Sequence, residues 1–231
     1  MNASVLEARH LTKSYGTTHA LAGVDLTILR GESVAIMGAS GSGKTTLLHV
    51  LAGIITPDSG SVSFQPSAGG PVDVAGLGES ARSRLRRERF GFVFQQGLLI
   101  PELTAVENVA LASMINGVSR ADAVAHATSW LAALGLAGME DRRIGELSGG
   151  QAQRVAIARA QATGADLVFA DEPTGALDST TSHEVMDALL WSTTGQGRTL
   201  LVVTHDPDVA ARCSRTVAVR DGRIVGTEVS A

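Results

Sequence analysis

Cysteines and long apolar runs are scarce in this sequence. Cys213 is the single cysteine among 231 residues, so no internal disulfide is possible and a reducing compartment is expected. No window approaches the roughly 18 uncharged apolar residues of a membrane-spanning helix. The first residues lack the basic region and the apolar stretch of a signal peptide, so we expect none. If the protein acts at a membrane, another chain must cross it.

Positive charge is also in short supply. The net charge is −4, and charged residues make up 18% of the chain, which argues against a nucleic-acid binder held by general electrostatics. Arginines nevertheless cluster in residues 82–89. They form either a nucleic-acid or lipid patch, or a solvated helix face partly offset by Glu79 and Glu88. The acidic balance of the whole chain favours the helix face.

The sequence does contain a glycine-rich phosphate-binding pattern, G-x-x-x-x-G-K-[ST], between an apolar run at 33–37 and a helical pattern at 46–52. Its residues are Gly38, Ala39, Ser40, Gly41, Ser42, Gly43, Lys44 and Thr45. Glycines let the backbone approach an anion, and the helix that follows presents its positive end to the phosphates. Lys44 would reach the β- and γ-phosphates, and the Thr45 hydroxyl would ligate Mg²⁺.

The remaining patterns predict an α/β fold. Buried strands are expected at 90–94, 166–170 and 198–204, with helices at 179–190 and after Pro207. Strands that alternate with helices indicate a parallel sheet covered on both faces. The first segment is rich in strands, and residues 104–162 are helical, with a turn at 147–150 before a helix at 151–162. We therefore expect a helical insertion into a strand–helix framework.

Polar side chains follow three of these strands. Gln95 follows the first, Asp171 and Glu172 the second, and His205 the third. Ligands of open parallel sheets gather at the carboxyl ends of the strands. Asp171 would order the water shell of Mg²⁺, and Glu172 would orient an attacking water. Gln95 would bind the metal or that water, and His205 the γ-phosphate, which together suffice for phosphoryl transfer.

These residues resemble an ATP-binding cassette (ABC) ATPase along nearly the whole chain. The stretch 147–151, LSGGQ, is similar to the signature sequence of that family. On residue pattern alone Tyr15 has either an ordinary packing role or a base-stacking role, and packing is favoured. The resemblance instead implies that Tyr15 stacks on adenine. It also implies that Thr46 belongs to the phosphate site, that Gln95 is the Q-loop glutamine and that His205 is the switch histidine. Asp171 and Glu172 resemble the Walker B pair, and Asp178 lies in the family's D-loop.

The resemblance implies an architecture as well. One nucleotide-binding domain, 1–231, would have a P-loop NTPase (RecA-like) core with a mainly parallel sheet and an N-terminal antiparallel β subdomain. Residues 1–95 and 163–231 would form this part, and 96–162 an inserted α-helical subdomain. Two such domains face each other head to tail around two ATP. Ser148, Gly149, Gly150 and Gln151 of one would then complete the ATP site of the other.

Longer stretches are similar to stand-alone cassettes of lipoprotein-release and macrolide-export type transporters. They cover residues 84–96, 103–109 and 171–175. This implies a cytoplasmic ATPase at the inner face of the membrane, bound through the region after Gln95 to a separate permease. Gly97, Ala152 and Ala39 depart from common family residues, but none removes a catalytic group.

Two alternatives remain open at this point. A regulatory cassette would signal through a membrane partner to cell-wall hydrolases without moving a substrate, and the size of its permease would distinguish it. DNA-repair and translation cassettes often carry coiled-coil inserts or two cassettes in one chain, and this sequence has neither. The transported substrate and the direction of transport are not encoded here, because the permease makes those contacts.

Overall fold

A mixed sheet forms the centre of the computed structural model, which describes residues 3–95 and 97–229. Within these residues its order is β10-β9-β3-β8-β7-β6, and all neighbours are parallel except the β9–β10 hairpin. The strands are β3 (Ser33–Met37), β6 (Phe90–Phe94), β7 (Leu167–Asp171), β8 (Thr199–Thr204), β9 (Arg215–Arg220) and β10 (Arg223–Val229). The predicted parallel sheet is therefore present, with one antiparallel edge strand.

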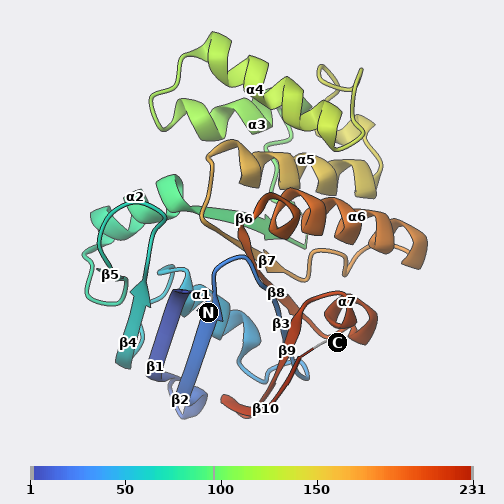
Figure 1. Ribbon diagram of the computed structural model, residues 1–231. Helices are drawn as coiled ribbons and strands as arrows, with labels where there is room; N and C mark the ends of the chain where they lie inside the picture. The colour runs from blue at the N-terminus through green and yellow to red at the C-terminus, as the bar shows by residue number, and fades with distance from the viewer. Residues whose placement is uncertain (1–2, 96, 230–231) are drawn as a thin grey trace.

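A second, antiparallel sheet lies beside the first (Figure 1). Its order is β2-β1-β4-β5, from β1 (Ser4–Tyr15), β2 (Thr18–Leu29), β4 (Ser59–Phe64) and β5 (Val72–Asp73). Side chains of helix α1 (Lys44–Leu51) share one buried cluster with both sheets. The helix that follows the phosphate-binding loop is thus held from two sides.

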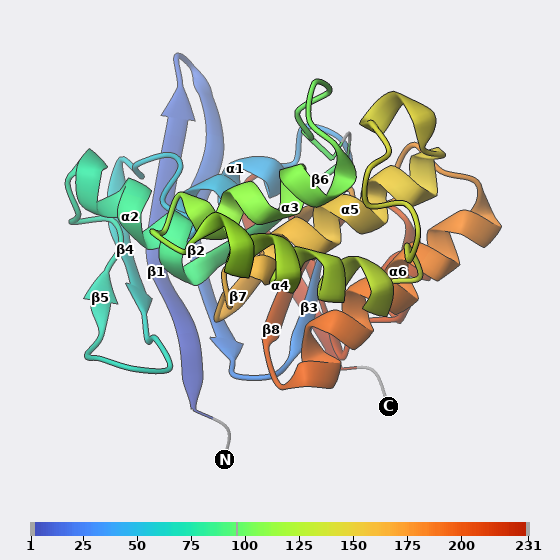
Figure 2. The same ribbon diagram turned by 90° about the horizontal axis from the view of Figure 1, so that it is seen from above.

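Helices cover the other face of the central sheet in two layers, which Figures 1 and 2 show from two directions. The helices nearest the sheet are α5 (Gly149–Ala162), α6 (Ser179–Ser192) and α7 (Pro207–Ala211). The outer layer is α3 (Ala105–Met114) and α4 (Arg120–Ala133), and short 3-10 turns lie at Ile144–Glu146 and Thr194–Gln196. No described helix is long and apolar enough to cross a membrane.

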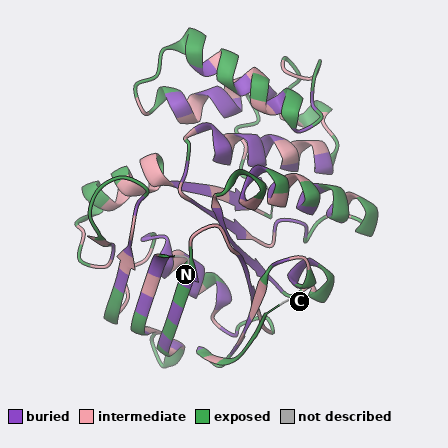
Figure 3. Ribbon diagram, viewed as in Figure 1, coloured by how far each residue is buried: buried purple, intermediate pink, exposed green. Residues whose placement is uncertain are grey.

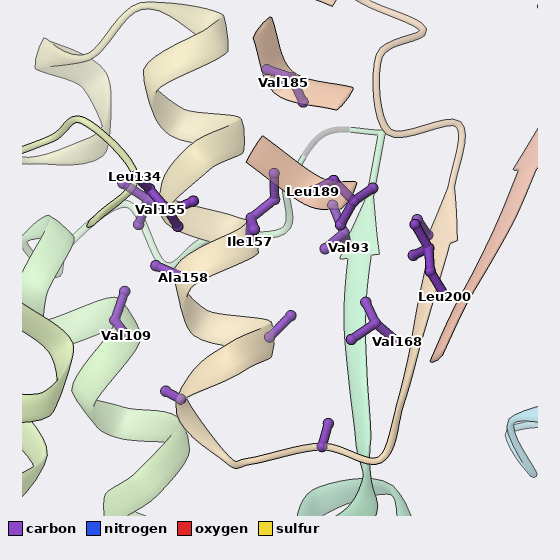
Figure 4. Close-up of a cluster of buried hydrophobic side chains, with 14 of the residues drawn as sticks. Val93, Val109, Leu134, Val155, Ile157, Ala158, Val168, Val185, Leu189 and Leu200 are labelled. Carbon is purple, nitrogen blue, oxygen red and sulfur yellow. The ribbon is translucent and has the colours of Figure 1, made fainter. Parts of the chain in front are cut away.

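Helix α5 lies between the central sheet and the outer helix layer (Figure 4). Ile157 and Val93 belong to one fully buried cluster, and so does Val109 of the outer helix α3. Figure 3 shows that α5 and the central strands are mostly buried, whereas the outward side of α4 is exposed. Helix α5 therefore packs against both the central sheet and the outer helices.

The arginine run forms helix α2 (Glu79–Arg89), as the helix-face interpretation expects. Arg82 and Arg86 both pair with Glu79, and Arg84 pairs with Glu88. The hydrogen bonds from Arg86 and then Arg82 lower the pKa of Glu79 to about 2. Much of the positive charge of this run is therefore matched within its own helix.

Candidate ATP site

The phosphate-binding loop connects β3 to α1 at the carboxyl edge of the central sheet. Its backbone needs glycine at two positions. Gly43 has φ +102°, and a Cβ there would lie 2.2 Å from the Ala20 carbonyl oxygen. A Cβ on Gly38 would lie 2.2 Å from the Val219 oxygen. The helix begins at Lys44, two residues before the predicted start, because the left-handed Gly43 is its N-cap.

Lys44 is 7% exposed, and its amine is held over the loop. Its Nζ donates to the carbonyl oxygens of Gly38 at 2.7 Å and Ala39 at 3.0 Å. The hydroxyl of Ser42 is buried and has no hydrogen-bond partner among the described residues. The hydrogen bonds of this buried ammonium to described residues go to neutral carbonyl oxygens, so a bound anion would add stronger, charge-assisted hydrogen bonds. The loop therefore fits a phosphate group.

A cavity of about 610 Å³ brings the loop and two of the strand-end residues together. It is lined by Thr18, Ala20, Ala39, Ser40, Gly41, Gly43, Lys44, Thr45, Thr46, Glu172 and His205. Its size is within the usual range for small-molecule sites. Thr18 and Ala20 come from β2, and no local sequence pattern marked them.

Asp171 lies beside the Thr45 hydroxyl at the end of β7. Thr45 Oγ1 donates to Asp171 Oδ1 at 3.4 Å. Burial raises the pKa of Asp171, and the charge of His49 opposes that rise. Burial likewise lowers the pKa of His49. A hydroxyl beside a desolvated carboxylate is a donor set that suits Mg²⁺, which prefers oxygen ligands. No role was assigned to His49 from the sequence. Its position one helical turn after Thr45 could have indicated that it lies on the same side of the helix as Thr45.

Glu172 and His205 form a hydrogen-bonded pair at the ends of β7 and β8. His205 Nδ1 lies 2.8 Å from Glu172 Oε1, and the Thr204 hydroxyl donates to Oε2 at 3.4 Å. The Glu172 side chain is 19% exposed, whereas that of His205 is 66% exposed. Glu172 has φ +47°, a strained conformation for a non-glycine residue. Strain of this kind concentrates at functional sites.

Other predicted site residues do not line this cavity. The side chain of Gln95 lies against Gly175, where an added Cβ would be 3.0 Å from Gln95 Nε2. Gln96, the second glutamine of the predicted pair, is outside the described residues. Tyr15 ends β1 and is 50% exposed, rather than packed inside. Its cross-strand partner Thr18 does line the cavity, so the end of β1 that carries Tyr15 lies beside it.

The signature residues also lie outside the cavity, and the predicted turn at 147–150 is wrong for its last two residues. Gly149 and Gly150 are helical, because Ser148 is the N-cap of α5 in a capping box. Gln151 N donates to Ser148 Oγ at 3.3 Å, and Ser148 N donates to Gln151 Oε1 at 2.9 Å. The positive end of α5 therefore begins at the exposed Ser148 and Gly149.

The start of α5 packs on Leu177, just before α6, and on Thr181 in the first turn of α6. A Cβ on Gly149 would lie 3.1 Å from Leu177 Cδ2, and one on Gly150 would lie 2.4 Å from Thr181 Cγ2. Asp178 is the N-cap of α6, and its carboxylate accepts from the Thr181 backbone N–H at 3.0 Å. That bond is the main reason why the pKa of Asp178 is lowered. Asp178 thus has a capping role that the sequence did not reveal.

The ABC transporter family model matches residues 21–175, which is more than half of the chain. This chain belongs to the ABC transporter family. The lipoprotein-releasing system ATP-binding protein LolD of Geobacter metallireducens is 46% identical over 227 residues, covering 96% of the chain and 99% of the relative. The macrolide export protein MacB of Marinobacter nauticus is 44% identical, and the pyoverdine export protein PvdT of Pseudomonas aeruginosa 47%. The chain spans 96% of its own length in both matches, but only 34% and 33% of those two relatives.

Solved ABC cassettes have the same fold. The post-hydrolysis dimer of the cassette MJ0796 bound to ADP and Pi has a TM-score of 0.87 and 36% identity, covering 98% of this chain and 99% of that one. The cassette cbiO1 of Clostridium perfringens also has a TM-score of 0.87, with 28% identity, and covers 100% of this chain and 90% of that one. The predicted family, its subgroup and the P-loop NTPase fold are confirmed. So is the prediction of an ATP-binding, ATP-hydrolysing transporter subunit, and the regulatory alternative is not favoured.

Proposed function

We propose that this cassette is the separate ATPase subunit of an export or lipoprotein-release type transporter, and that it works as a dimer around two ATP. The observation that carries this proposal is the separation of the two phosphate-binding features. Lys44, Glu172 and His205 line one cavity, whereas Ser148 opens a different helix and is exposed. Each chain therefore supplies half of two sites, and a second copy or a homologous cassette completes them.

Each site residue has a proposed task in hydrolysis. The loop from Gly38 to Thr46 would hold the triphosphate, with Lys44 facing its terminal phosphates. Glu172 would orient the attacking water, and His205 would bind the γ-phosphate while paired with Glu172. Thr45, Asp171 and Gln95 would hold Mg²⁺, which supplies charge neutralisation on the phosphates when it is bound.

The in-trans contacts would come from the signature residues of the second subunit. The Ser148 hydroxyl and the backbone N–H groups of Gly149 and Gly150 would approach the γ-phosphate at the positive end of α5. Gln151 would keep that end formed through its capping box. Asp178 is the N-cap of the neighbouring helix α6. We assign it to the same interface between the two subunits. Tyr15 would stack on adenine at the cavity rim.

The permease contact is proposed for the region after Gln95. Leu98 is 59% exposed and Ile115 of the C-terminal end of α3 is 57% exposed, so apolar side chains are open on the helical part. We propose that residues 96–162 form the helical subdomain and that 1–95 and 163–231 form the core. Through its permease the cassette would lie at the inner face of the membrane, and no nucleic acid would be a partner.

Protein concentration tests the dimeric site. We expect the specific ATPase activity of the isolated chain to rise with protein concentration and to reach a plateau once dimers form, because a monomer lacks half of each site. Activity is measured as phosphate release, alongside light scattering for mass. Constant specific activity across a range in which the chain stays monomeric would contradict the proposal.

A further inference from the structure

The segment between helix α1 and strand β4 is hydrogen-bonded to the C-terminal part of β1. Helix α1 ends at Leu51, and the chain reaches β4 through the turn that contains Asp58. Asp58 N donates to the Thr12 oxygen at 2.8 Å. Thr12 is also paired with Ser59, and their hydroxyls are 2.7 Å apart. This turn therefore connects the phosphate-binding part of the site to the end of β1.

The carboxylate of Asp58 makes two further bonds to β1, on the residues directly before Tyr15. Its Oδ2 accepts from the Ser14 backbone N–H at 2.7 Å, and its Oδ1 accepts from Lys13 Nζ at 2.9 Å. The Lys13 side chain is 18% exposed, and its Nζ lies 5.9 Å from the centre of the Tyr15 ring. An ammonium group over a ring is attracted by the π-electrons. The hydrogen bond from Lys13 also lowers the pKa of Asp58, because it stabilises the charged carboxylate.

We propose that Asp58 is a positioning residue for the base of ATP, which acts by fixing the backbone of Ser14 and the ammonium of Lys13 around Tyr15. The ring is half exposed, and its strand partner Thr18 lines the phosphate-loop cavity. With Asp58 in place, the distance from the stacking ring to the phosphate loop is set before ATP arrives. Preorganisation of this kind strengthens binding, because less freedom is lost when the ligand binds. The inference rests on the proposed contact between Tyr15 and adenine.

Two ligands and two variants test it. Affinity is measured by calorimetry for ATP and for inorganic tripolyphosphate, which has the phosphates but no base. We expect Asp58→Ala to weaken ATP binding about three- to tenfold, a part of what a base–aromatic stack contributes. Tripolyphosphate binding should change by less than about twofold, because it does not use Tyr15. In a Tyr15→Ala background, Asp58→Ala should change ATP affinity by less than about twofold.

The control is Asp25→Ala. Asp25 accepts from the backbone N–H of His10 at 2.8 Å, and its other oxygen lies 2.9 Å from the His10 ring nitrogen. It thus holds the same strand β1 in the same way, but far along the strand from Tyr15, and its loss should leave ATP affinity unchanged. Asp58→Asn, which still accepts from Ser14 N but loses the charge that pairs with Lys13, should recover part of the affinity.

The outcomes separate the two claims. If Tyr15→Ala leaves ATP affinity unchanged, the proposed adenine contact fails, and the role of Asp58 fails with it. If Tyr15→Ala weakens ATP but Asp58→Ala does not, only the role of Asp58 is overturned. Equal losses of ATP and tripolyphosphate, or a full loss in the Tyr15→Ala background, would also overturn it, since Asp58 would then act on the fold or the loop.

Discussion

Glu172→Gln is expected to lower the rate of ATP hydrolysis by about 10²- to 10⁴-fold while ATP still binds. The amide keeps the shape of the side chain and can still pair with His205, which lies 2.8 Å from Glu172 Oε1. It cannot take up a proton or polarise a water as a carboxylate does. Single-turnover phosphate release measures the rate, and calorimetry measures ATP affinity. Because the bound ATP is not hydrolysed, we also expect this variant to accumulate as a dimer, and light scattering measures its mass.

The matched control is Glu184→Gln. Glu184 is a 60% exposed carboxylate on α6, paired with Arg154, and we expect its exchange to leave turnover unchanged because exposed ion pairs contribute little. Hydrolysis by Glu172→Gln at the wild-type rate would show that another group orients the water. The positive φ of Glu172 is tolerated equally by glutamine, so misfolding would not explain a loss.

Lys44→Ala has the second large expected effect. The amine of Lys44 is buried and bonded to two loop carbonyl oxygens, so its removal takes away both the phosphate partner and a support of the loop. A charge-assisted hydrogen bond contributes about 1.5–3 kcal/mol, and we expect ATP affinity to fall about ten- to a hundredfold. Equilibrium titration with ATP measures this.

Two further variants sharpen the Lys44 result. Lys44→Arg should also bind ATP poorly, since the planar guanidinium does not fit the place of a compact ammonium. Arg120→Ala removes a cation whose side chain is 74% exposed on α4 and should bind ATP normally. Unchanged ATP affinity in Lys44→Ala would remove the loop from the proposed site.

The sequence was sufficient to predict the central strands and the polar residues that follow them. The strand at 33–37 agrees with β3 residue for residue, and β6 begins and ends as predicted. These strands are short apolar runs bounded by polar residues, so their pattern is local. The carboxyl-end rule then placed Glu172 and His205 together, because it depends only on strand direction.

Helix starts and side-chain partners were harder to predict. Glycines at 149 and 150 suggested a turn by propensity, but the reciprocal capping of Ser148 and Gln151 and close packing against Leu177 and Thr181 favour the helix. The hydrogen bond between Asp58 and Ser14 of β1 joins residues that are 44 positions apart in the sequence. Contacts at such separation depend on how the sheets pack, which no local pattern reports.

A mixing experiment tests the shared active site most directly. Lys44→Ala disables the phosphate loop, and Ser148→Arg disables the exposed start of α5; each variant alone should hydrolyse ATP poorly. In a mixture, a heterodimer pairs the intact loop of one chain with the intact signature of the other. We predict that the mixture hydrolyses ATP well above the sum of its parts. Activity equal to that sum, in samples shown to contain heterodimers, would contradict a site built from two subunits.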